Sequence, residues 1–215
     1  GFYYKPRVDK ELLKEFSEGL ICLSGCPTSE ISKALLNKNY ELAKKLVKEY
    51  LDIFGKDNFY IEVNYHPNIE DSKKLKKLLI NLAEEFNLPL VATYDSHYIY
   101  PEDNEIHDIF LAVQTGKDIE DKERLSMKND DFSLADYDRI FELNKDIPQA
   151  IENTLEIAEK CNLEIELGKL KFPKYPIPQG ETEISYLRKL VEKGISKRNL
   201  KYEEIKDRID YELKI

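Results

Sequence analysis

Short apolar runs typical of β-strands alternate with amphipathic helical segments through most of this sequence, and this alternation restricts the fold more than any other feature. Strands that alternate with helices favour βα units around a parallel sheet or barrel, because a parallel strand requires a crossover connection. The predicted strands are GLICLS (19–24), NFYIEVN (58–64) and LPLVAT (88–93). The helical periodicity predicts helices at about 28–37, 40–54, 71–86 and 101–114.

The C-terminal part of the sequence follows a different pattern. Residues 117–136 favour a loop with a brief strand, before helices near 134–143 and 147–161. The stretch KFPKYPIPQG (171–180) contains three of the nine prolines, which excludes a regular helix or a central strand and predicts a linker. Two further helices are predicted at 182–198 and 202–214, and each has an apolar face with no evident partner in this chain.

The charge distribution excludes one class of function. The net charge is -9, whereas a broad nucleic-acid-binding face needs clustered Lys and Arg in excess. Any contact with DNA is therefore expected to be local. The Lys and Glu residues recur at helical spacing, as in YELAKKLVKEYLDIF, which is typical of solvated helix faces.

The three cysteines form no even set for disulfides, and the sequence contains neither a signal peptide nor a membrane-spanning apolar run. We therefore expect a cytoplasmic protein that does not bind a membrane. The chain starts with Gly1 and stops within a helical pattern, so we also expect it to be part of a longer polypeptide.

Asp95 and His97 directly follow the third predicted strand. In an extended segment they project to the same side, with Cα atoms about 6.6 Å apart. A carboxylate and an imidazole each bind a divalent metal at about 2.0–2.2 Å, and the strand ends of βα barrels carry the active sites. In isolation the pair is weak evidence, because Asp95 can cap the next turn and His97 can be a structural histidine.

Cys26 occupies the equivalent place after the first strand, in LICLSGCP. Because strand ends in a parallel sheet converge on one edge, Cys26 could add a thiolate to the same site. Cys22 lies within the apolar run and is expected to be a small buried hydrophobic residue. Cys161 is expected to be either a packing residue or a thiol without a function. His66 and His107 are expected to be structural rather than ligating.

Two or three ligands make an incomplete hydrolytic site. The sequence contains no H-x-H, H-E-x-x-H, G-x-S-x-G or Walker-type motif. These residues alone therefore do not predict a self-sufficient enzyme, and no catalytic residue is assigned.

Five segments resemble, in order and with matching gaps, the family of bacterial replicative DNA polymerase III alpha subunits. They are GFYYKPRVDKELL, GLICLSGCPTSEI, VATYDSHYIYPEDNEIHDIFLAVQTGK, ENTLEIAEKCNLEIELGK and FPKYPIPQGET. This collinear resemblance covers nearly the whole chain, and it is more specific than any single motif within it.

The resemblance implies a fold and a domain organisation. Residues 1–170 would be the C-terminal part of a PHP (polymerase and histidinol phosphatase) domain, an α/β fold forming part of a distorted seven-stranded βα barrel. Residues 171–180 would be a proline-rich linker, and residues 181–215 the first short helices of the palm or thumb region. Because half a barrel exposes a sheet edge, the fragment is expected to self-associate.

The resemblance also implies metal ligands. Cys26 matches the family's late cysteine ligand, and Asp95 and His97 match its closing D-x-H pair. The implied metals are zinc, manganese or iron at the PHP site and magnesium at the polymerase site. The earlier PHP ligands are expected upstream of Gly1 and the polymerase aspartates beyond Ile215, so this chain would hold only an incomplete metal site.

The implied function is template-directed DNA synthesis in DNA replication by the parent protein, with DNA, deoxynucleotides, a sliding clamp and a proofreading subunit as partners. The PHP portion would act as a scaffold, with a metal-dependent 3′ to 5′ exonuclease or a pyrophosphate-hydrolysing activity in the intact protein, and the fragment alone would be inactive. Two alternatives stay open: a stand-alone PHP phosphoesterase of the histidinol phosphatase type, and a purely structural interaction module.

Overall fold

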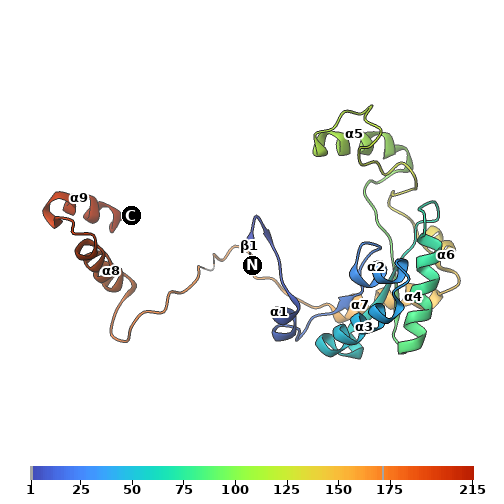
Figure 1. Ribbon diagram of the computed structural model, residues 1–215, viewed down its shortest axis with the longest axis horizontal. Coiled ribbons are helices and arrows are strands. Elements are labelled where there is room, and N and C mark those ends of the chain that lie inside the picture. The colour runs from blue at the N-terminus through green and yellow to red at the C-terminus, as the bar shows by residue number, and fades with distance from the viewer. Residues whose placement is uncertain (1, 171) are drawn as a thin grey trace. The chain divides into compact units, whose positions relative to one another are not determined.

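The computed structural model describes residues 2–170 and 172–215, which divide into two compact units (Figure 1). Unit 1 comprises residues 2–163 and unit 2 comprises residues 164–215. Unit 1 contains the strands and seven of the α-helices, and unit 2 contains the other two. Among the described residues, no helix combines the length and apolar content that a membrane span requires.

The main sheet of unit 1 has three parallel strands in the order β3-β4-β5. Its strands are β3 (Cys22–Leu23), β4 (Phe59–Asn64) and β5 (Leu90–Thr93). A separate antiparallel pair is formed by β1 (Phe2–Tyr3) and β2 (Lys5–Pro6). The predicted α/β class with parallel strands is thus confirmed, and the described residues contain a three-stranded parallel sheet.

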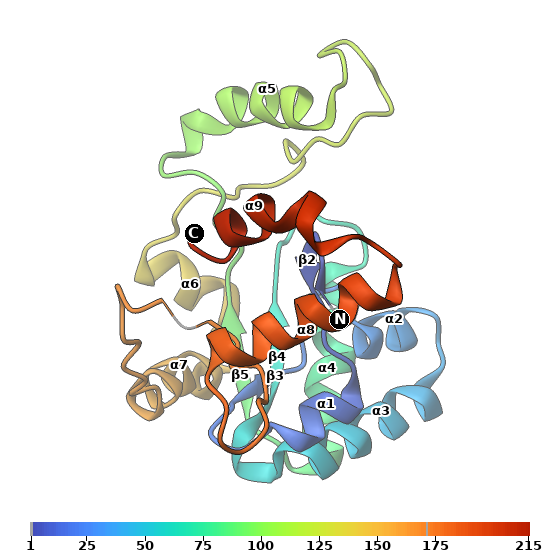
Figure 2. The ribbon, with the colours of Figure 1, turned by 90° about the vertical axis from the view of Figure 1, so that its left-hand side faces the viewer.

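Helices connect and cover these strands. Figure 2 shows α7 beside β5, and α4 beside β4. The 3-10 helices are η1 (Lys56–Asn58) and η2 (Pro101–Asp103). The α-helices of unit 1 are α1 (Lys10–Glu15), α2 (Glu30–Leu36), α3 (Tyr40–Phe54), α4 (Ser72–Phe86), α5 (Asn104–Thr115), α6 (Tyr137–Asn144) and α7 (Pro148–Lys160).

The alternation of side chains along β4 sorts the residues of this central strand onto two faces. Phe59, Ile61 and Val63 are buried in the hydrophobic core, against apolar residues of α2, α3 and α4. Each such side chain contributes about 1.5–3 kcal/mol when it is fully buried. Glu62 and Asn64 point to the other face, where they line a pocket.

The expected strands and helices form at nearly the expected places, but several local details differ. Asp71 precedes α4 as predicted, but it has left-handed backbone angles and its side chain makes no capping hydrogen bond. Asn87 ends α4 in the left-handed conformation that commonly terminates a helix. The sequence pattern did not predict α1. Within residues 117–136, where a loop with a brief strand is expected, Ser133 forms an isolated parallel bridge with Tyr98, a partner that the pattern did not predict.

Unit 2 consists of an extended segment followed by α8 (Glu183–Lys197) and α9 (Tyr202–Glu212). The predicted linker includes Lys171, which lies outside the described residues, and residues 172–180 form neither helix nor strand. Thr182 caps α8 through a reciprocal hydrogen-bond pair with Ser185. No described residue of unit 2 is buried.

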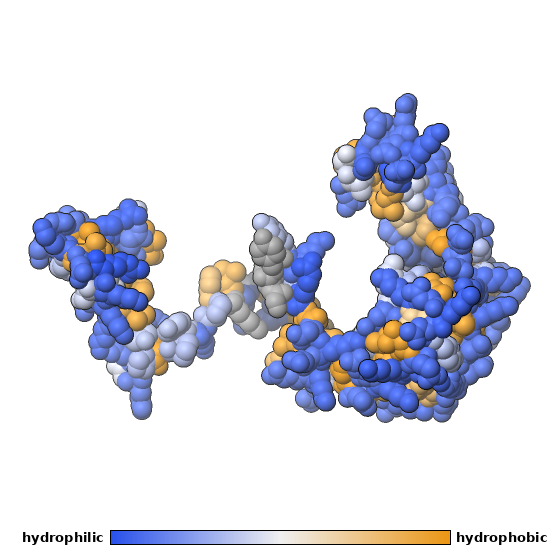
Figure 3. All heavy atoms as spheres, in the orientation of Figure 1, coloured by the Kyte–Doolittle hydropathy of each residue, from blue (hydrophilic) through white to orange (hydrophobic). Residues whose placement is uncertain are grey.

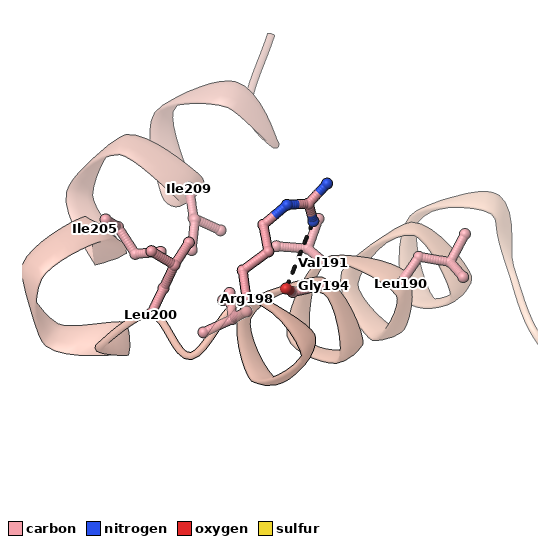
Figure 4. A pocket seen from close by; sticks show the side chains of 8 residues that line it. Leu190, Val191, Gly194, Arg198, Leu200, Ile205 and Ile209 are labelled. Atoms are coloured by element: carbon pink, nitrogen blue, oxygen red, sulfur yellow. Dashed lines mark hydrogen bonds between the residues drawn. The ribbon is translucent and has the colours of Figure 1, made fainter.

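Apolar side chains of α8 and α9 face each other across an open groove of about 350 Å³ (Figure 4). Arg198 lies at this groove and donates a hydrogen bond to the carbonyl oxygen of Gly194. Apolar side chains are exposed on the surfaces of both units (Figure 3).

Candidate metal-binding pocket

A pocket of about 540 Å³ lies at the carboxyl ends of β3, β4 and β5. Parallel strands bring their carboxyl ends to the same edge, which is where ligands bind in α/β folds. The returning segment after α5 closes one side of the pocket. The lining residues are Cys26, Pro27, Thr28, Glu62, Asn64, His66, Ile69, Ser72, Thr93, Tyr94, Asp95, Ser126, Met127, Asn129 and Phe132.

Two of the three predicted ligands, Cys26 and Asp95, line this pocket. His97 is not among the lining residues, but its Nε2 lies 3.1 Å from Oδ1 of Asp95. The backbone N–H of His97 donates to the carbonyl oxygen of Phe132 at 2.8 Å, which fixes the segment that carries both side chains. Asp95 and His97 therefore lie side by side at the edge of the pocket.

The turn after β3 presents Cys26 to the pocket. Gly25 has φ +86°, a left-handed conformation that favours glycine, and a Cβ atom at this position would lie 3.0 Å from Cβ of Ser29. Ser29 then caps α2 by accepting a hydrogen bond from the Ser32 N–H. The exposed Cys26 thiol lies 3.1 Å from the Thr28 hydroxyl.

The other cysteines and His107 lie outside the pocket. Burial raises the pKa of the Cys22 thiol to about 11, so Cys22 stays protonated, as suits a packing residue. Cys161 is exposed at the end of α7. The ring of His107 lies 5.3 Å from the rings of both His97 and Tyr98, and thus joins α5 to the segment after β5.

His66 belongs to the pocket wall, although the sequence pattern indicated only a structural histidine. It is 3% exposed and stacks between Tyr94 and Phe132, with ring centroids 4.8 and 4.5 Å away. Within the described part of the chain, neither ring nitrogen has a hydrogen-bond partner, and Nδ1 lies 3.8 Å from Oδ2 of Asp130. Burial lowers the pKa of His66, which favours the neutral imidazole.

Glu62 also lines the pocket, and the sequence pattern did not single it out. Its Oε1 accepts a hydrogen bond from the Thr93 hydroxyl at 2.7 Å, and its backbone N–H donates to the Ser24 hydroxyl at 2.9 Å. The sequence signal for Glu62 is its position between the core residues Ile61 and Val63. Because side chains alternate along a strand, this position places Glu62 on the opposite face of the sheet.

The chemistry of the pocket suits a divalent cation. It contains two carboxylates, a thiol and an imidazole, and none of the described residues that line it is a lysine or an arginine. The Asp95 carboxylate is exposed and free to meet a cation, and the Glu62 carboxylate is half-buried. However, no three His, Cys, Asp or Glu side chains among residues 2–170 and 172–215 are grouped closely enough to hold one ion. The donors fit a metal but do not complete a site, and Cys26, Asp95 and His97 stay predicted ligands.

Comparison with known proteins connects this pocket to a family. The PHP domain family matches residues 1–66, which include Cys26, Glu62 and His66. Over 217 residues, and across 100% of its length, the chain is 40% identical to the DNA polymerase III subunit alpha of Treponema pallidum. The chain is thus similar, along its whole length, to one region of a DNA polymerase III alpha subunit. It is also 38% identical over 219 residues to the Borreliella burgdorferi subunit and 37% identical over 207 residues to that of Thermus aquaticus.

The matched region is a small part of these relatives. The chain spans 18% of the Treponema pallidum protein, 19% of the Borreliella burgdorferi protein and 17% of the Thermus aquaticus protein, while 100%, 100% and 92% of this chain is aligned. Because the similarity continues far beyond residue 66, it includes unit 2 as well as the PHP match. Similarity to the PHP domain and to DNA polymerases generally implies the use of divalent metals.

Proposed function

We propose that this chain is part of a replicative DNA polymerase that carries out template-directed DNA synthesis. The observation that carries the proposal is the similarity to DNA polymerase III alpha subunits along the whole chain. A stand-alone phosphoesterase of the PHP type is less well supported, because the similarity to the polymerase subunits does not stop at the PHP match. DNA, deoxynucleotides, a sliding clamp and a proofreading subunit are the partners of this proposed polymerase, which acts in the cytoplasm.

The PHP portion of the proposed polymerase binds zinc, manganese or iron through Cys26, Asp95 and His97, together with ligands outside this chain. Three observations support this role. Cys26 and Asp95 line one pocket, Nε2 of His97 lies 3.1 Å from Oδ1 of Asp95, and no lysine or arginine is among the described lining residues. When bound, the metal would supply a Lewis acid for phosphodiester hydrolysis, the chemistry of a 3′ to 5′ exonuclease.

The proposed domain organisation places residues 1–170 in the PHP domain, residues 171–180 in a linker, and residues 181–215 in the first helices of the palm or thumb region. The three-stranded sheet would then be one part of a distorted seven-stranded barrel. The short β3 at the edge of the described sheet supports this proposal, because an edge strand leaves backbone groups for another strand to pair. The helices α8 and α9, neither of which buries any residue, need a further surface to pack against.

Primer extension tests the polymerase proposal. We expect the alpha subunit that carries this segment to extend a primer on a single-stranded template with four deoxynucleotides and magnesium, and the 215-residue chain alone to be inactive. Absence of extension by the intact subunit would contradict the proposal.

Release of the 3′-terminal nucleotide from a labelled oligonucleotide tests the PHP site separately. Asp95→Asn should abolish this release while primer extension continues. Asp52→Asn is a matched control, because Asp52 is exposed on α3 outside the pocket, and it should retain both activities. Equal nucleotide release by Asp95→Asn and the unmodified subunit would refute the exonuclease role.

A further inference from the structure

Glu62 places a carboxylate in the central strand of a parallel sheet, where apolar residues normally predominate. Its neighbours Ile61 and Val63 are buried in the core, whereas Glu62 is half-buried on the opposite face and lines the pocket. Partial burial of a carboxylate carries a desolvation cost, and no lysine or arginine among the described lining residues neutralises it. The contacts of Glu62 indicate what offsets this cost.

On one side, Glu62 is tied to the turn that carries Cys26. Its backbone N–H donates to the Ser24 hydroxyl at 2.9 Å, and the Ser24 N–H donates to the carbonyl oxygen of Tyr60 at 2.9 Å. Ser24 is 7% exposed and is followed directly by Gly25 and Cys26. Residues 60–62 of β4 therefore fix the start of the Cys26 turn.

On the other side, Glu62 is tied to the segment that carries Asp95. The Thr93 hydroxyl donates to Oε1 of Glu62 at 2.7 Å, and Nδ2 of Asn64 donates to the same hydroxyl at 3.4 Å. Thr93 is the last residue of β5, and Asp95 follows two positions later. The side chain of Glu62 thus holds the end of β5 from the neighbouring strand.

We propose that Glu62 is a positioning residue of the metal pocket, which holds the Cys26 turn and the Asp95 segment in register from the strand between them. This inference rests on the proposed metal-binding function. Glu62 acts through its hydrogen bond to Thr93 and not as a ligand. Residues that orient metal ligands commonly change metal affinity by about 10–100-fold when they are replaced.

Zn²⁺ affinity of the intact alpha subunit, measured by competition with a chromophoric chelator, tests this proposal. Thr93→Val and Glu62→Leu each remove the hydroxyl–carboxylate bond and should weaken Zn²⁺ binding by about 10-fold or more. Thr93→Ser retains the hydroxyl, and Glu62→Gln retains an oxygen that accepts from Thr93. Both should bind within about threefold of the unmodified protein, because the positioning bond survives.

Tyr50→Phe is the matched control. It removes a hydroxyl–carboxylate bond of the same kind, from Tyr50 to Glu30 at 2.5 Å, between residues that do not line the pocket. It should leave Zn²⁺ affinity unchanged. Unchanged affinity in both Thr93→Val and Glu62→Leu would overturn the proposal. Equal losses in Glu62→Gln and Glu62→Leu would also overturn it, because the charge rather than the hydrogen bond would then matter.

The same titration separates the two levels of the argument. If the unmodified subunit binds Zn²⁺ and Asp95→Asn does not, the proposed metal site stands. The Thr93 and Glu62 variants then test only the positioning role. If the unmodified subunit binds no Zn²⁺, the proposed metal site fails and the positioning role fails with it.

Discussion

Replacement of Lys76 by methionine tests how unit 1 is held together away from the pocket. Lys76 lies on α4, is 7% exposed, and donates from Nζ to Oδ1 of Asp146 at 2.6 Å and to the carbonyl oxygen of Leu143 at 2.8 Å. Its ammonium group also lies 4.8 Å from the centre of the Tyr65 ring. One buried cation thus joins α4 to the last turn of α6 and to the connection that follows it.

The expected loss of stability follows from these contacts. The hydrogen bond from the charged Nζ to the Leu143 carbonyl contributes about 1.5–3 kcal/mol. The cation–π contact adds about 0.5–1 kcal/mol. The pair with Asp146 adds only about 0–1 kcal/mol, because the Asp146 side chain is 58% exposed and returns to water. Methionine retains the apolar stem and avoids burial of a charge, so the net loss should be about 2 kcal/mol.

Urea denaturation followed by far-UV circular dichroism measures this loss. With a slope of about 2 kcal/mol per molar urea, the midpoint of unfolding should fall by about 1 M in Lys76→Met. Asp146→Asn is the control, and it should lower the free energy of unfolding by less than about 1 kcal/mol. The reasoning is refuted if Lys76→Met matches the unmodified protein, or if Asp146→Asn is as destabilising as Lys76→Met.

Three further predictions concern other parts of unit 1. The hydrogen bonds from Arg124 lower the pKa of the Asp108 carboxyl from 3.8 to about 2. This contribution to the free energy of unfolding is present above about pH 4 and is lost as the pH falls towards about 2. The difference in stability between the unmodified protein and Asp108→Asn should therefore shrink over that range. A constant difference would contradict this assignment. Gly25→Ala should lower the free energy of unfolding by about 1–2 kcal/mol, because Gly25 has φ +86° and a Cβ would lie 3.0 Å from Cβ of Ser29. Thermal unfolding measures this loss, and an unchanged melting temperature would argue against the strain. Leu82→Ala removes a side chain with 0% exposure and should lower the free energy of unfolding, measured by urea denaturation, by about 2–5 kcal/mol. A decrease below about 1 kcal/mol would show that the core is less tightly packed than described.

Local patterns in the sequence predicted most of the secondary structure. The apolar periodicity of α3 and α4 and the β-branched and aromatic residues of β4 are local signals, and the observed bounds differ from the expected ones by at most a few residues. The convergence of strand ends predicted that Cys26 and Asp95 would lie near one edge of the sheet, and both line the pocket there. Their assignment as metal ligands stays a prediction.

Other features of the pocket depend on contacts between residues far apart in the sequence. The stacking of His66 on Phe132 and the bridge between Tyr98 and Ser133 arise only when the segment after α5 returns to the sheet. Nothing local in the sequence specifies that return. The role of Glu62 depends on the register of β4 against β5, which pairs Glu62 with Val91, and a strand pattern alone does not give this register.

The metal content of the purified alpha subunit tests most directly the central claim that this pocket belongs to a metal-binding PHP domain of a polymerase. Elemental analysis by mass spectrometry should detect zinc, manganese or iron in the unmodified subunit. The combined variant Cys26→Ala, Asp95→Asn should contain much less metal while it remains folded by circular dichroism. Equal metal content in the two proteins, or no bound metal in either, would contradict the account.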